Sequence, residues 1–469
     1  MKYELVAGLE THVELSTKTK LFCSCEVAFG KKPNTLCCPV CMGHPGTLPV
    51  MNRQAVYFAV MAGLALNCRI SQKSYMERKN YFYPDLPKAY QITQLREPLC
   101  TDGYLELASG KRIRINRIQL EEDAGKLIHR DDAVCVDYNR CGVPLIEIVS
   151  EPDFSSPEEA REYLEKLRIL MRYIGISDCR MQEGSMRFDV NISAKEKGSS
   201  TLGTRTEIKN MNSISNMIKG MEYEFNRQCD ILAKGEQVLQ QTMRFDDITF
   251  TTSPMRNKED AQDYRFFREP DIPAIVLSPE EIESIKASMP ELPAEKMHKY
   301  MEFGISEQDA EQLSKYRNVA QFFDVVTKET ESPLLASNLI ISRIFATFKS
   351  ENDKEDFKLL ITPLQFAELL KLAEDGSISK NLAKTTLDKM LVSGKSAGEY
   401  ITEEDTKKLT DEEISDLCKK AAEENPRIVN DYKSGKDKAL MALLGAVMRL
   451  SKGKADPEKV TEILKNILA

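Results

Sequence analysis

The sequence lacks the motifs of several common enzyme classes. It has only four histidines, and none of its cysteines has an obvious histidine partner along the chain. It also contains no G-x-S-x-G turn and no serine-rich amidase segment. A serine or cysteine nucleophile needs a neighbouring base to become reactive. We therefore expect no hydrolase nucleophile in this chain, and in particular none for the hydrolysis of glutamine.

A complete phosphate-binding loop is missing as well. Gly394-Lys395-Ser396 resembles the end of the G-x-x-x-x-G-K-[ST] motif, but Lys389 stands where that motif has its first glycine. The backbone cradle for phosphate is therefore absent. Any nucleotide chemistry of this chain must use a different phosphate site.

The sequence also lacks two features that would place the protein in or across a membrane: a long apolar run and an N-terminal targeting segment. No apolar run approaches the ~20 residues that a membrane-spanning helix needs. Strand-like sequence begins by residue 4, so we expect neither a secretory signal nor a transit peptide. Twelve cysteines without such a signal favour a reducing compartment, where cysteines bind metals more often than they form disulfides. We predict a cytoplasmic protein that does not associate with membranes.

The pattern of the chain predicts an α+β fold in three parts. Residues 1–293 read mainly as strands and irregular loops, and a Pro290-Glu291-Leu292-Pro293 segment closes this part because proline stops helices and central strands. We expect residues 294–404 to form an all-α domain and residues 405–469 a small helical tail domain. Helices are expected in the first part at Arg53–Leu66, Pro157–Tyr173 and Asn212–Lys234. In the second part they are expected at Ala294–Phe303, Ser306–Leu313, Asn318–Glu329, Leu334–Phe348, Thr362–Asp375 and Ser379–Leu391.

The tail is basic although the whole chain is acidic. From Asn425 to Ala469 there are seven lysines and two arginines against three aspartates and two glutamates, a net charge of +4, whereas the chain has a net charge of -8. A basic tail on an acidic body is typical of an enzyme that holds a nucleic acid at its periphery. An ordinary solvated helical face would have the same composition, and charge alone leaves both interpretations open.

The strand-like segment Gly8–Leu15 has one polar face. Side chains alternate across a strand, so Glu10, His12 and Glu14 share a face opposite to that of Leu9 and Val13. Two carboxylates flanking an imidazole can bind a hard metal or transfer a proton. On this segment alone, a solvated face of an edge strand is the competing interpretation.

Two further carboxylates fall where a core pattern would have apolar residues. Glu147 shares a predicted strand face with Leu145, and Glu122 shares one with Leu120. A carboxylate among apolar neighbours is costly unless it has a partner. We therefore expect His12, Glu122 and Glu147 to point inward from one sheet, an arrangement that suits Mg²⁺, although the residues alone leave the nature of the partner open. A buried ion pair of glutamate with Arg117 or Arg140 is the alternative.

Four cysteines near the start of the chain have the spacing of a metal knuckle. Cys23 and Cys25 form a C-x-C pair, Cys38 and Cys41 form a C-x-x-C pair, and the loop between them is long enough to fold back. Four thiolates from two short turns suit a tetrahedral structural zinc site. The competing interpretation is a set of buried thiols, and Cys37 is a spare cysteine that could replace one ligand.

Two polar stretches are candidates for binding phosphate or a base. One is the loop at 78–92, which interleaves Lys79 and Lys88 with tyrosines and prolines, and the other is a predicted hairpin with alternating charges. A packed surface loop and cross-strand ion pairs are the respective alternatives. The residues in question are Lys79, Tyr81, Tyr83, Lys88 and Tyr90 in the loop, and Arg187, Asp189, Asn191, Arg205, Glu207 and Lys209 in the hairpin.

Taken together, these blocks resemble the B subunits of the aspartyl/glutamyl-tRNA amidotransferases. The family signature D-x-N-R-x-G-x-P-L-[LI]-E-I is present from Asp137 to Ile148. The resemblance spans essentially the whole chain. Its other blocks are Gly8-Leu9-Glu10, Lys79-Asn80-Tyr81-Phe82-Tyr83-Pro84-Asp85, Glu121-Glu122-Asp123-Ala124-Gly125-Lys126, Glu207-Ile208-Lys209-Asn210-Met211-Asn212-Ser213, Asp263-Tyr264-Arg265-Phe266-Phe267 and Asp431-Tyr432-Lys433-Ser434-Gly435-Lys436.

The resemblance implies a two-step carbon–nitrogen ligase reaction in a cradle-shaped kinase domain. ATP and Mg²⁺ would phosphorylate the side-chain carboxylate of glutamate or aspartate misattached to tRNA, and ammonia would then displace the phosphate. The implied partners are the amidase (A) subunit, which makes ammonia from glutamine, the small (C) subunit of a heterotrimer, and misacylated Glu-tRNA(Gln) or Asp-tRNA(Asn). A non-catalytic, zinc-stabilised scaffold that binds tRNA is the alternative function.

The resemblance also assigns roles to residues. It implies that the catalytic residues are Glu10, His12, Lys79, Glu122 and Glu147, with Mg²⁺ on His12, Glu122 and Glu147. It implies that Cys23, Cys25, Cys38 and Cys41 hold Zn²⁺, as in the zinc-bearing branch of the family. The tRNA-binding residues would be Lys433, Lys436, Lys452 and Lys454, and the residues for ATP or substrate would be Tyr81, Tyr83, Lys88, Tyr90, Arg187, Asp189, Asn191, Glu207 and Lys209. The chain departs from the family pattern at Gln119, Phe266 and Arg268, where His, Tyr and Pro are frequent.

Overall fold

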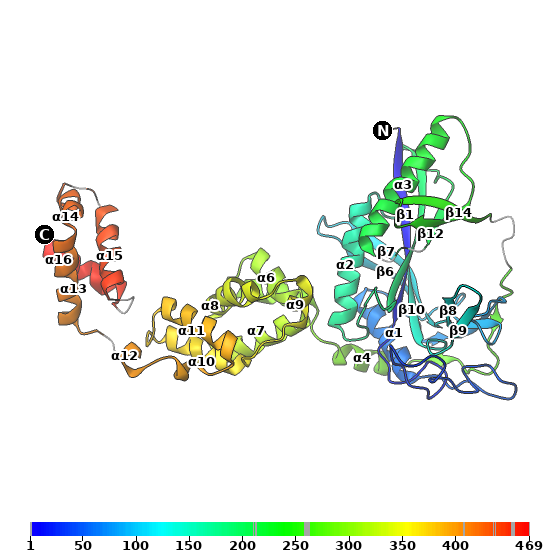
Figure 1. Cartoon of the computed structure of the whole chain (residues 1–469), viewed down its shortest axis with the longest axis horizontal. Coiled ribbons are helices and arrows are strands. Elements are labelled where there is room, and N and C mark those ends of the chain that lie inside the picture. Colours follow the sequence, from blue (N-terminus) through cyan, green and yellow to red (C-terminus); the bar gives the residue numbers. More distant parts are fainter. Residues whose placement is uncertain are drawn as a thin grey trace. The chain divides into compact units, whose positions relative to one another are not determined.

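A computed structural model describes residues 2–209, 211, 213–257, 263–406, 409–434, 436, 438–451 and 455–468. It is an α+β protein, as expected from the sequence (Figure 1). The chain divides into two compact units, Met1–Leu292 and Pro293–Ala469, and the first unit ends within the predicted proline-flanked segment. The division of the second unit into a middle domain and a tail domain stays a prediction. Among the described residues no helix has the length and apolarity needed to cross a membrane.

A nine-stranded sheet is the framework of the first unit. Its strand order is β14-β13-β12-β11-β1-β10-β7-β6-β2, so that the opening strand β1 lies in the middle rather than at an edge. Central strands of a sheet are paired on both sides, which excludes the solvated edge strand considered for residues 8–15. The strands are β1 (Tyr3–Glu14), β2 (Arg69–Ile70), β6 (Cys100–Glu106), β7 (Arg112–Glu122), β10 (Pro144–Ser150), β11 (Met186–Glu196), β12 (Thr206–Lys209), β13 (Gln241–Asp246) and β14 (Thr251–Asn257).

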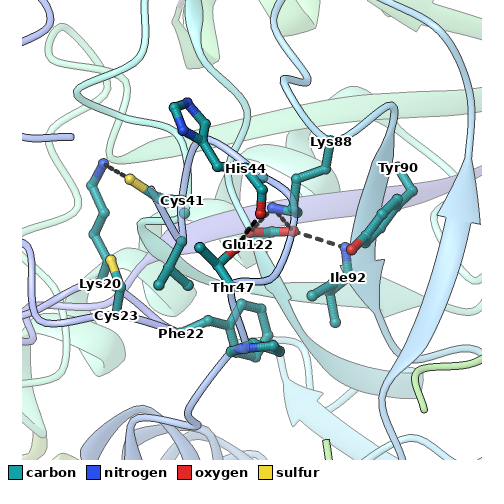
Figure 2. A pocket seen from close by; sticks show the side chains of 14 residues that line it. Lys20, Phe22, Cys23, Cys41, His44, Thr47, Lys88, Tyr90, Ile92 and Glu122 are labelled. Atoms are coloured by element: carbon teal, nitrogen blue, oxygen red, sulfur yellow. Dashed lines mark hydrogen bonds and ion pairs between the residues drawn. The ribbon is translucent and has the colours of Figure 1, made fainter. Parts of the chain in front are cut away.

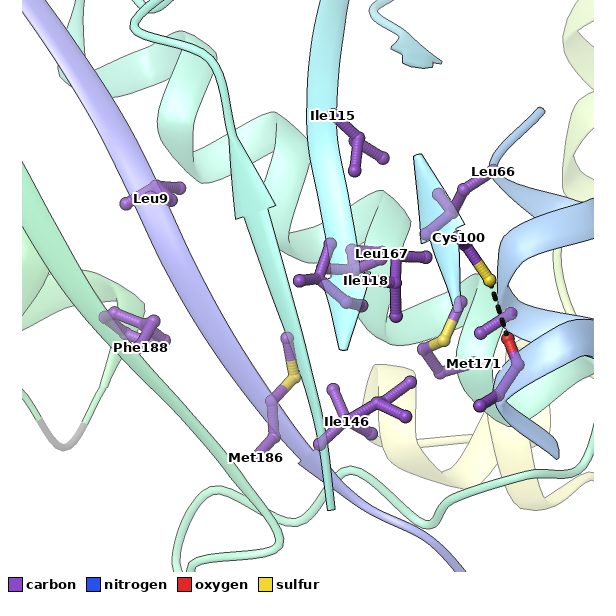
Figure 3. Close-up of a cluster of buried hydrophobic side chains, with 14 of the residues drawn as sticks. Leu9, Leu66, Cys100, Ile115, Ile118, Ile146, Leu167, Met171, Met186 and Phe188 are labelled. Carbon is purple, nitrogen blue, oxygen red and sulfur yellow. Dashed lines mark hydrogen bonds between the residues drawn. The ribbon is translucent and has the colours of Figure 1, made fainter. Parts of the chain in front are cut away.

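One face of this sheet is apolar and packs on helices. Leu9 of β1, Ile118 of β7 and Ile146 of β10 belong to one buried cluster with Leu167 of helix α2 (Figure 3). The helices of this cluster are α1 (Arg53–Ala65), α2 (Pro157–Tyr173), α3 (Ile214–Ala233) and α4 (Pro279–Ser288), the last through Ile285. Because the helices bury one face, alternation turns the polar residues of the same strands to the other face.

Local sequence signals place α1, α2 and α3 as expected. Ser156 is the N-cap of α2, since its hydroxyl accepts a hydrogen bond from the backbone N–H of Glu159, and Pro157 occupies the first turn. Helix α1 ends one residue earlier than predicted, and α3 is observed from Ile214 to Ala233. The predicted first residue of α3, Asn212, lies outside the described residues.

Three small sheets and one further helix complete the first unit. In the sheet β15-β4-β5 the strands are β4 (Glu77–Asn80), β5 (Tyr90–Thr93) and β15 (Phe267–Arg268). Lys79 therefore lies on a strand, and only residues 81–89 of the segment predicted as a loop at 78–92 lie outside β4 and β5. The other two pair β3 (Lys73–Ser74) with β16 (Ile275–Val276), and β8 (Lys126–His129) with β9 (Val134–Asp137). Helix α4 (Pro279–Ser288), which was not among the predicted helices, begins with a capping box formed by Ser278 and Glu281.

Among its described residues the second unit contains helices and no strands. The predicted helix Leu334–Phe348 is divided: an α-helix gives way to one π-helical turn at Ile340–Ile344 and then to a 3-10 turn at Phe345–Thr347. The α-helices are α5 (Pro293–Glu302), α6 (Glu307–Ser314), α7 (Arg317–Glu329), α8 (Pro333–Leu339), α9 (Glu351–Asp356), α10 (Pro363–Glu374), α11 (Lys380–Ser393), α12 (Glu403–Thr406), α13 (Asp411–Glu424), α14 (Pro426–Lys433), α15 (Lys438–Leu450) and α16 (Pro457–Leu468).

The last helices share a small hydrophobic core of their own. Cys418 of α13, Leu443 of α15 and Leu464 of α16 are fully buried in it. Lys433 lies exposed at the end of α14, and the exposed Lys436 makes a 2.8 Å ion pair with Asp431. Lys452 and Lys454, two of the four predicted tRNA-binding lysines, lie outside the described residues.

Candidate active site

The polar face of the nine-stranded sheet gathers residues from four adjacent strands, β11, β1, β10 and β7. His12 of β1 lies directly opposite Glu147 of β10, and Glu147 lies opposite Gln119 of β7. On the other side of β1, His12 lies opposite Arg187 of β11. Directly opposed residues of antiparallel strands point to the same face. The register therefore brings together, on one face, polar side chains that are far apart in the sequence.

One imidazole and two carboxylates meet on this face, and we call them the carboxylate–imidazole cluster: His12, Glu121 and Glu147. His12 Nε2 lies 3.5 Å from Glu121 Oε1 and 3.7 Å from Glu147 Oε1. Each residue offers a ligand atom within 4.8 Å of the other two. Three donors at such distances can share one divalent cation.

The prediction of Glu122 as a member of this cluster was wrong by one residue. Leu145 lies opposite both Glu14 of β1 and Glu121 of β7, so the side chain of Glu121 shares the face of Glu147. Alternation then turns Glu122 to the opposite side, together with Leu120. There the Glu122 carboxylate makes a 2.7 Å ion pair with Lys88 and accepts a 3.0 Å hydrogen bond from the backbone N–H of Ile92.

Burial shifts the pKa values of all three residues of the carboxylate–imidazole cluster. It lowers the pKa of His12 to about 3, an effect that the charge of Arg187 reinforces, so the imidazole is neutral and can serve as a ligand. Burial raises the pKa of Glu121. Burial and the negative charge of Glu121 together raise the pKa of Glu147 to about 8. The positive charge of Lys79 opposes both of these shifts. A divalent cation among the two carboxylates would offset the same cost of burial, so these residues fit Mg²⁺.

Neighbouring side chains orient the two glutamates. The Nε2 group of Gln119 donates a hydrogen bond to Glu147 Oε2, and Thr93 Oγ1 donates one to Glu121 Oε2 at 3.0 Å. Arg117, which was considered as a partner of a buried glutamate, donates instead to Gln119 Oε1 at 2.9 Å. Metal-ligating carboxylates usually have such outer hydrogen bonds.

Arg140, the other partner considered, belongs to a charged network at the end of β7. Its guanidinium lies 3.5 Å from Asp123 Oδ2, and Arg187 donates a 2.9 Å hydrogen bond to the same oxygen. Burial alone would raise the pKa of Asp123, but the two arginines lower it to about 2. Burial and the charge of Asp123 raise the pKa of Glu14 to about 8. The predicted Arg187 thus serves in an ion pair beside the carboxylate–imidazole cluster.

A second group of three carboxylates lies farther along the same face: Glu10, Asp189 and Glu207. Each offers an oxygen within 4.8 Å of the others. Lys209 Nζ binds two of them, at 2.8 Å from Asp189 and 3.0 Å from Glu207, and Asn191 donates a 2.8 Å hydrogen bond to Glu10. Of the cross-strand ion pairs considered for the predicted hairpin, the pair of Asp189 with Lys209 is therefore present, and the pair of Lys209 with Glu207 lies within β12.

Lys79 lies beside the carboxylate–imidazole cluster in an aromatic setting. Its Nζ is 4.8 Å from the ring centre of Tyr264 and 5.7 Å from that of Tyr81. Asn80 holds the Tyr264 segment in place, because its backbone N–H donates to the Tyr264 carbonyl at 2.9 Å. In the sequence Tyr264 stands out only as part of a family block, since no local pattern connects it to Lys79 across 185 positions; the proximity of the two is visible only in the structure.

The other aromatic residues of the predicted loop lie in different surroundings. Tyr83 is exposed and lines a shallow pocket with Phe82, Pro84, Leu86 and Ala89. Tyr90 stacks on Arg78, whose guanidinium carbon lies 4.3 Å from the ring centre. Lys88 contacts Glu122 rather than the carboxylate–imidazole cluster.

The four predicted knuckle cysteines converge, and we call them the cysteine cluster: Cys23, Cys25, Cys38 and Cys41. Their sulfur atoms all lie within 4.8 Å of one another, and Cys37 does not belong to this group. A hydrogen bond from Cys23 lowers the pKa of Cys41 to about 4, against the effect of burial. The backbone N–H of Cys38 also donates to Cys41 Sγ, at 3.2 Å. This donor set fits a tetrahedral zinc ion.

A cavity of about 100 Å³ separates the cysteine cluster from the Lys88–Glu122 pair (Figure 2). Cys23, Cys41 and Lys20 line one side of it, and Lys88 and Glu122 line the other. No sequence pattern indicates that Lys20 takes part in this arrangement.

Comparisons with known proteins identify the family of the chain. A family model described as the GatB/GatE catalytic domain matches residues 5–283, and one described as the GatB domain matches residues 321–468. The B subunit of the aspartyl/glutamyl-tRNA(Asn/Gln) amidotransferase of Thermoanaerobacter pseudethanolicus is 48% identical over 475 residues, covering 100% of each chain. The protein of the same name from Caldicellulosiruptor saccharolyticus is 47% identical and covers 100% of this chain and 99% of its own.

The sheet with its polar face is thus the catalytic domain of an amidotransferase component, followed by the helical region that accompanies it in the family. The chain belongs to the GatB family, the B subunits of the aspartyl/glutamyl-tRNA(Asn/Gln) amidotransferases. As a B subunit it forms part of a complex with other subunits.

Proposed function

We propose that this chain uses ATP and Mg²⁺ to phosphorylate the side-chain carboxylate of Glu-tRNA(Gln), Asp-tRNA(Asn) or both. Ammonia, made from glutamine by an amidase partner, then displaces the phosphate to give Gln-tRNA(Gln) or Asn-tRNA(Asn). The observation that carries the proposal is the convergence of His12, Glu121 and Glu147 on the polar face of the sheet, with Lys79 beside them. The partners in this proposal are the amidase (A) subunit, the small (C) subunit and the tRNA, in the cytoplasm.

The site residues would have separate roles in phosphoryl transfer. His12, Glu121 and Glu147 would hold Mg²⁺, which supplies positive charge for the phosphate oxygens when bound. The ammonium of Lys79 would stabilise the oxygens of the transferred phosphoryl group, and the rings of Tyr81 and Tyr264 keep it in position. Burial of the glutamates keeps this end of the site poor in water, which protects an acyl phosphate from hydrolysis.

The remaining predicted contacts form part of the same proposal. Glu10, Asp189, Asn191, Glu207 and Lys209 line the polar face next to the cluster, where ATP or the aminoacyl end of tRNA would lie. The cysteine cluster would bind one structural Zn²⁺. The alternative, a scaffold that only binds tRNA, is less favoured because the carboxylate–imidazole cluster keeps its three donors and its orienting partners.

Hydrolysis of ATP by the assembled complex tests the proposal. With Mg²⁺, glutamine and misacylated Glu-tRNA(Gln), we expect release of ADP and phosphate together with Gln-tRNA(Gln). Correctly acylated Gln-tRNA(Gln) is the control, and it should not stimulate hydrolysis because it has no side-chain carboxylate to phosphorylate. A complex that forms amidated tRNA without consuming ATP would refute the kinase role.

Gln119→Leu should weaken the proposed magnesium site. Leucine has a similar volume but donates no hydrogen bond, so Glu147 loses the partner that orients it. We expect the Mg²⁺ concentration for half-maximal ATP hydrolysis to rise by about 10- to 100-fold. Gln119→His, which restores the residue frequent in the family, should keep the wild-type value. A titration of ATP hydrolysis with Mg²⁺ measures this concentration for both variants and wild type. Equal half-maximal Mg²⁺ concentrations for wild type and Gln119→Leu would contradict the role of Gln119.

Charge reversal in the tail should affect binding of tRNA but not glutamine hydrolysis. Lys433 and Lys436 are exposed, so Lys433→Glu with Lys436→Glu changes the charge without removing a helix of the tail core. We expect weaker tRNA binding and a decrease in the slope of log affinity against log salt by about 1 per lost phosphate contact. Lys18→Glu, an exposed change in the first unit, is the control. An unchanged salt slope would assign the tail to contacts between subunits instead.

A further inference from the structure

Lys20 is a buried lysine whose ammonium reaches a sulfur atom. Its surface is 0% exposed, and Nζ lies 3.7 Å from Cys41 Sγ and 3.3 Å from the carbonyl oxygen of Tyr138. Figure 2 shows the side chain extending alongside Cys23 toward Cys41. The backbone is fixed too, since Lys20 N–H donates to the Cys25 carbonyl at 2.9 Å.

The side-chain partner of the Lys20 ammonium is the sulfur of Cys41. Among the described residues, no carboxylate lies within ion-pair distance of Lys20, and the nearby Glu122 carboxylate is already paired with Lys88. A buried ammonium is costly unless an opposite charge compensates it. Four thiolates around a divalent zinc ion have a formal net charge of about -2. The cysteine cluster in its metal-bound form would supply the missing charge, and a cluster of neutral thiols would not.

The position of Lys20 is reinforced by the turn that carries the family signature. Leu21 N–H donates to the Gly142 carbonyl at 2.8 Å, and the thiol of Cys141 donates to the Cys41 carbonyl at 3.5 Å. Gly142 has a positive φ of 84°, and a side chain there would approach Lys20 Cδ at 3.5 Å and Cys41 Cβ at 3.6 Å. The lysine is thus enclosed between the cysteine cluster and this turn.

We propose that Lys20 is the charge-balancing partner of a zinc–thiolate site, holding the metal and lowering the nucleophilicity of the Cys41 thiolate. This inference rests on the proposed zinc. The ammonium donates a hydrogen bond to the sulfur, which withdraws electron density from the thiolate while the thiolate still ligates the metal. Lys20 acts on the metal through Cys41 and is not itself a ligand.

Substitution of Lys20 in the full-length chain tests this inference. Lys20→Met removes the charge with little change of shape, Lys20→Arg keeps the charge, and Lys18→Met is a matched control at an exposed lysine of the same segment. The measurements are zinc content, the rate of zinc loss to EDTA, and the rate of alkylation of Cys41 by iodoacetamide, followed by mass spectrometry. We expect Lys20→Met to lose zinc and to be alkylated at least about tenfold faster than wild type. Lys18→Met should match wild type, and Lys20→Arg should lie closer to wild type than to Lys20→Met.

A second measurement separates charge balance from simple packing. After removal of zinc by EDTA, the cluster loses its fixed negative charge, so Lys20→Met should melt at the same temperature as the metal-free wild type or higher. With zinc bound, Lys20→Met should melt at a lower temperature than zinc-bound wild type. If Lys20→Met does not fold, Lys20→Gln takes its place.

The outcomes distinguish the two proposals. If wild type holds about one zinc and Lys20→Met loses it at the wild-type rate, the role of Lys20 is refuted while the zinc site stands. If Lys20→Arg loses zinc as fast as Lys20→Met, the positive charge does not explain zinc retention, and the charge-balancing role of Lys20 is again refuted. If wild type binds no zinc, both proposals are wrong.

Discussion

Glu121→Gln is expected to reduce tRNA-dependent ATP hydrolysis by the assembled complex by at least about 100-fold. The change keeps the shape of the side chain but removes one of the two carboxylate charges next to His12. Phosphoryl transfer depends on the cation that these charges would hold. Steady-state release of phosphate in the presence of Glu-tRNA(Gln) measures the effect. Gel filtration of the complex checks that the variant still assembles.

Glu122→Gln is the matched control for this prediction. Its carboxylate lies next in sequence but pairs with Lys88 on the other side of the strand. Breaking a buried pair leaves the ammonium uncompensated, so we expect a loss of about 3–5 kcal/mol in the free energy of unfolding. The Mg²⁺ dependence of the remaining ATP hydrolysis should equal that of wild type. A shifted Mg²⁺ dependence in Glu122→Gln, with none in Glu121→Gln, would restore Glu122 as the ligand.

The prediction of Glu122 in place of Glu121 shows which features a strand pattern can predict and which it cannot. Alternation along β1 identified the polar face with Glu10 and His12, because a single strand specifies its own faces. Which of two adjacent glutamates on β7 joins that face depends on the register between strands. Register follows from the pairing of Leu145 with Glu121, and no local pattern encodes it.

Long-range partners could not be predicted from the sequence for the same reason. The knuckle cysteines converge as expected because their spacing is local. Lys20, Thr93 and Tyr264 contribute through contacts between distant segments and belong to no spacing motif. Helix positions were predicted well where caps and prolines mark the ends, as for α2. The π-helical turn at Ile340–Ile344 has no proline or glycine that would indicate it.

Removal of the proposed zinc should open the segment between Phe22 and Val50 while leaving the sheet intact. In this segment the described backbone has almost no regular secondary structure. Its order depends on the cysteine cluster, on bonds at its two ends, and on hydrogen bonds to residues 136–141, such as those from Asn34 Nδ2 to the Val136 carbonyl at 2.9 Å and from Leu36 N–H to Asn139 Oδ1 at 2.8 Å. At those ends Val50 N–H donates to the Phe22 carbonyl at 3.0 Å. The core of the first unit is formed by the sheet and its helices, which gives it stability independent of the metal.

Cys38→Ser combined with Cys41→Ser provides the test. We expect zinc to fall from about one per chain to a background level, because two of the four ligands are lost. Limited proteolysis should then cut between residues 23 and 49 at least about tenfold faster, with far-ultraviolet circular dichroism nearly unchanged. Cys37→Ser is the control, since Cys37 lies outside the cysteine cluster, and it should retain zinc and protease resistance. Equal loss of zinc in Cys37→Ser would mean that this cysteine replaces one of the four ligands. Unchanged proteolysis in the double variant would mean that packing rather than metal orders the segment.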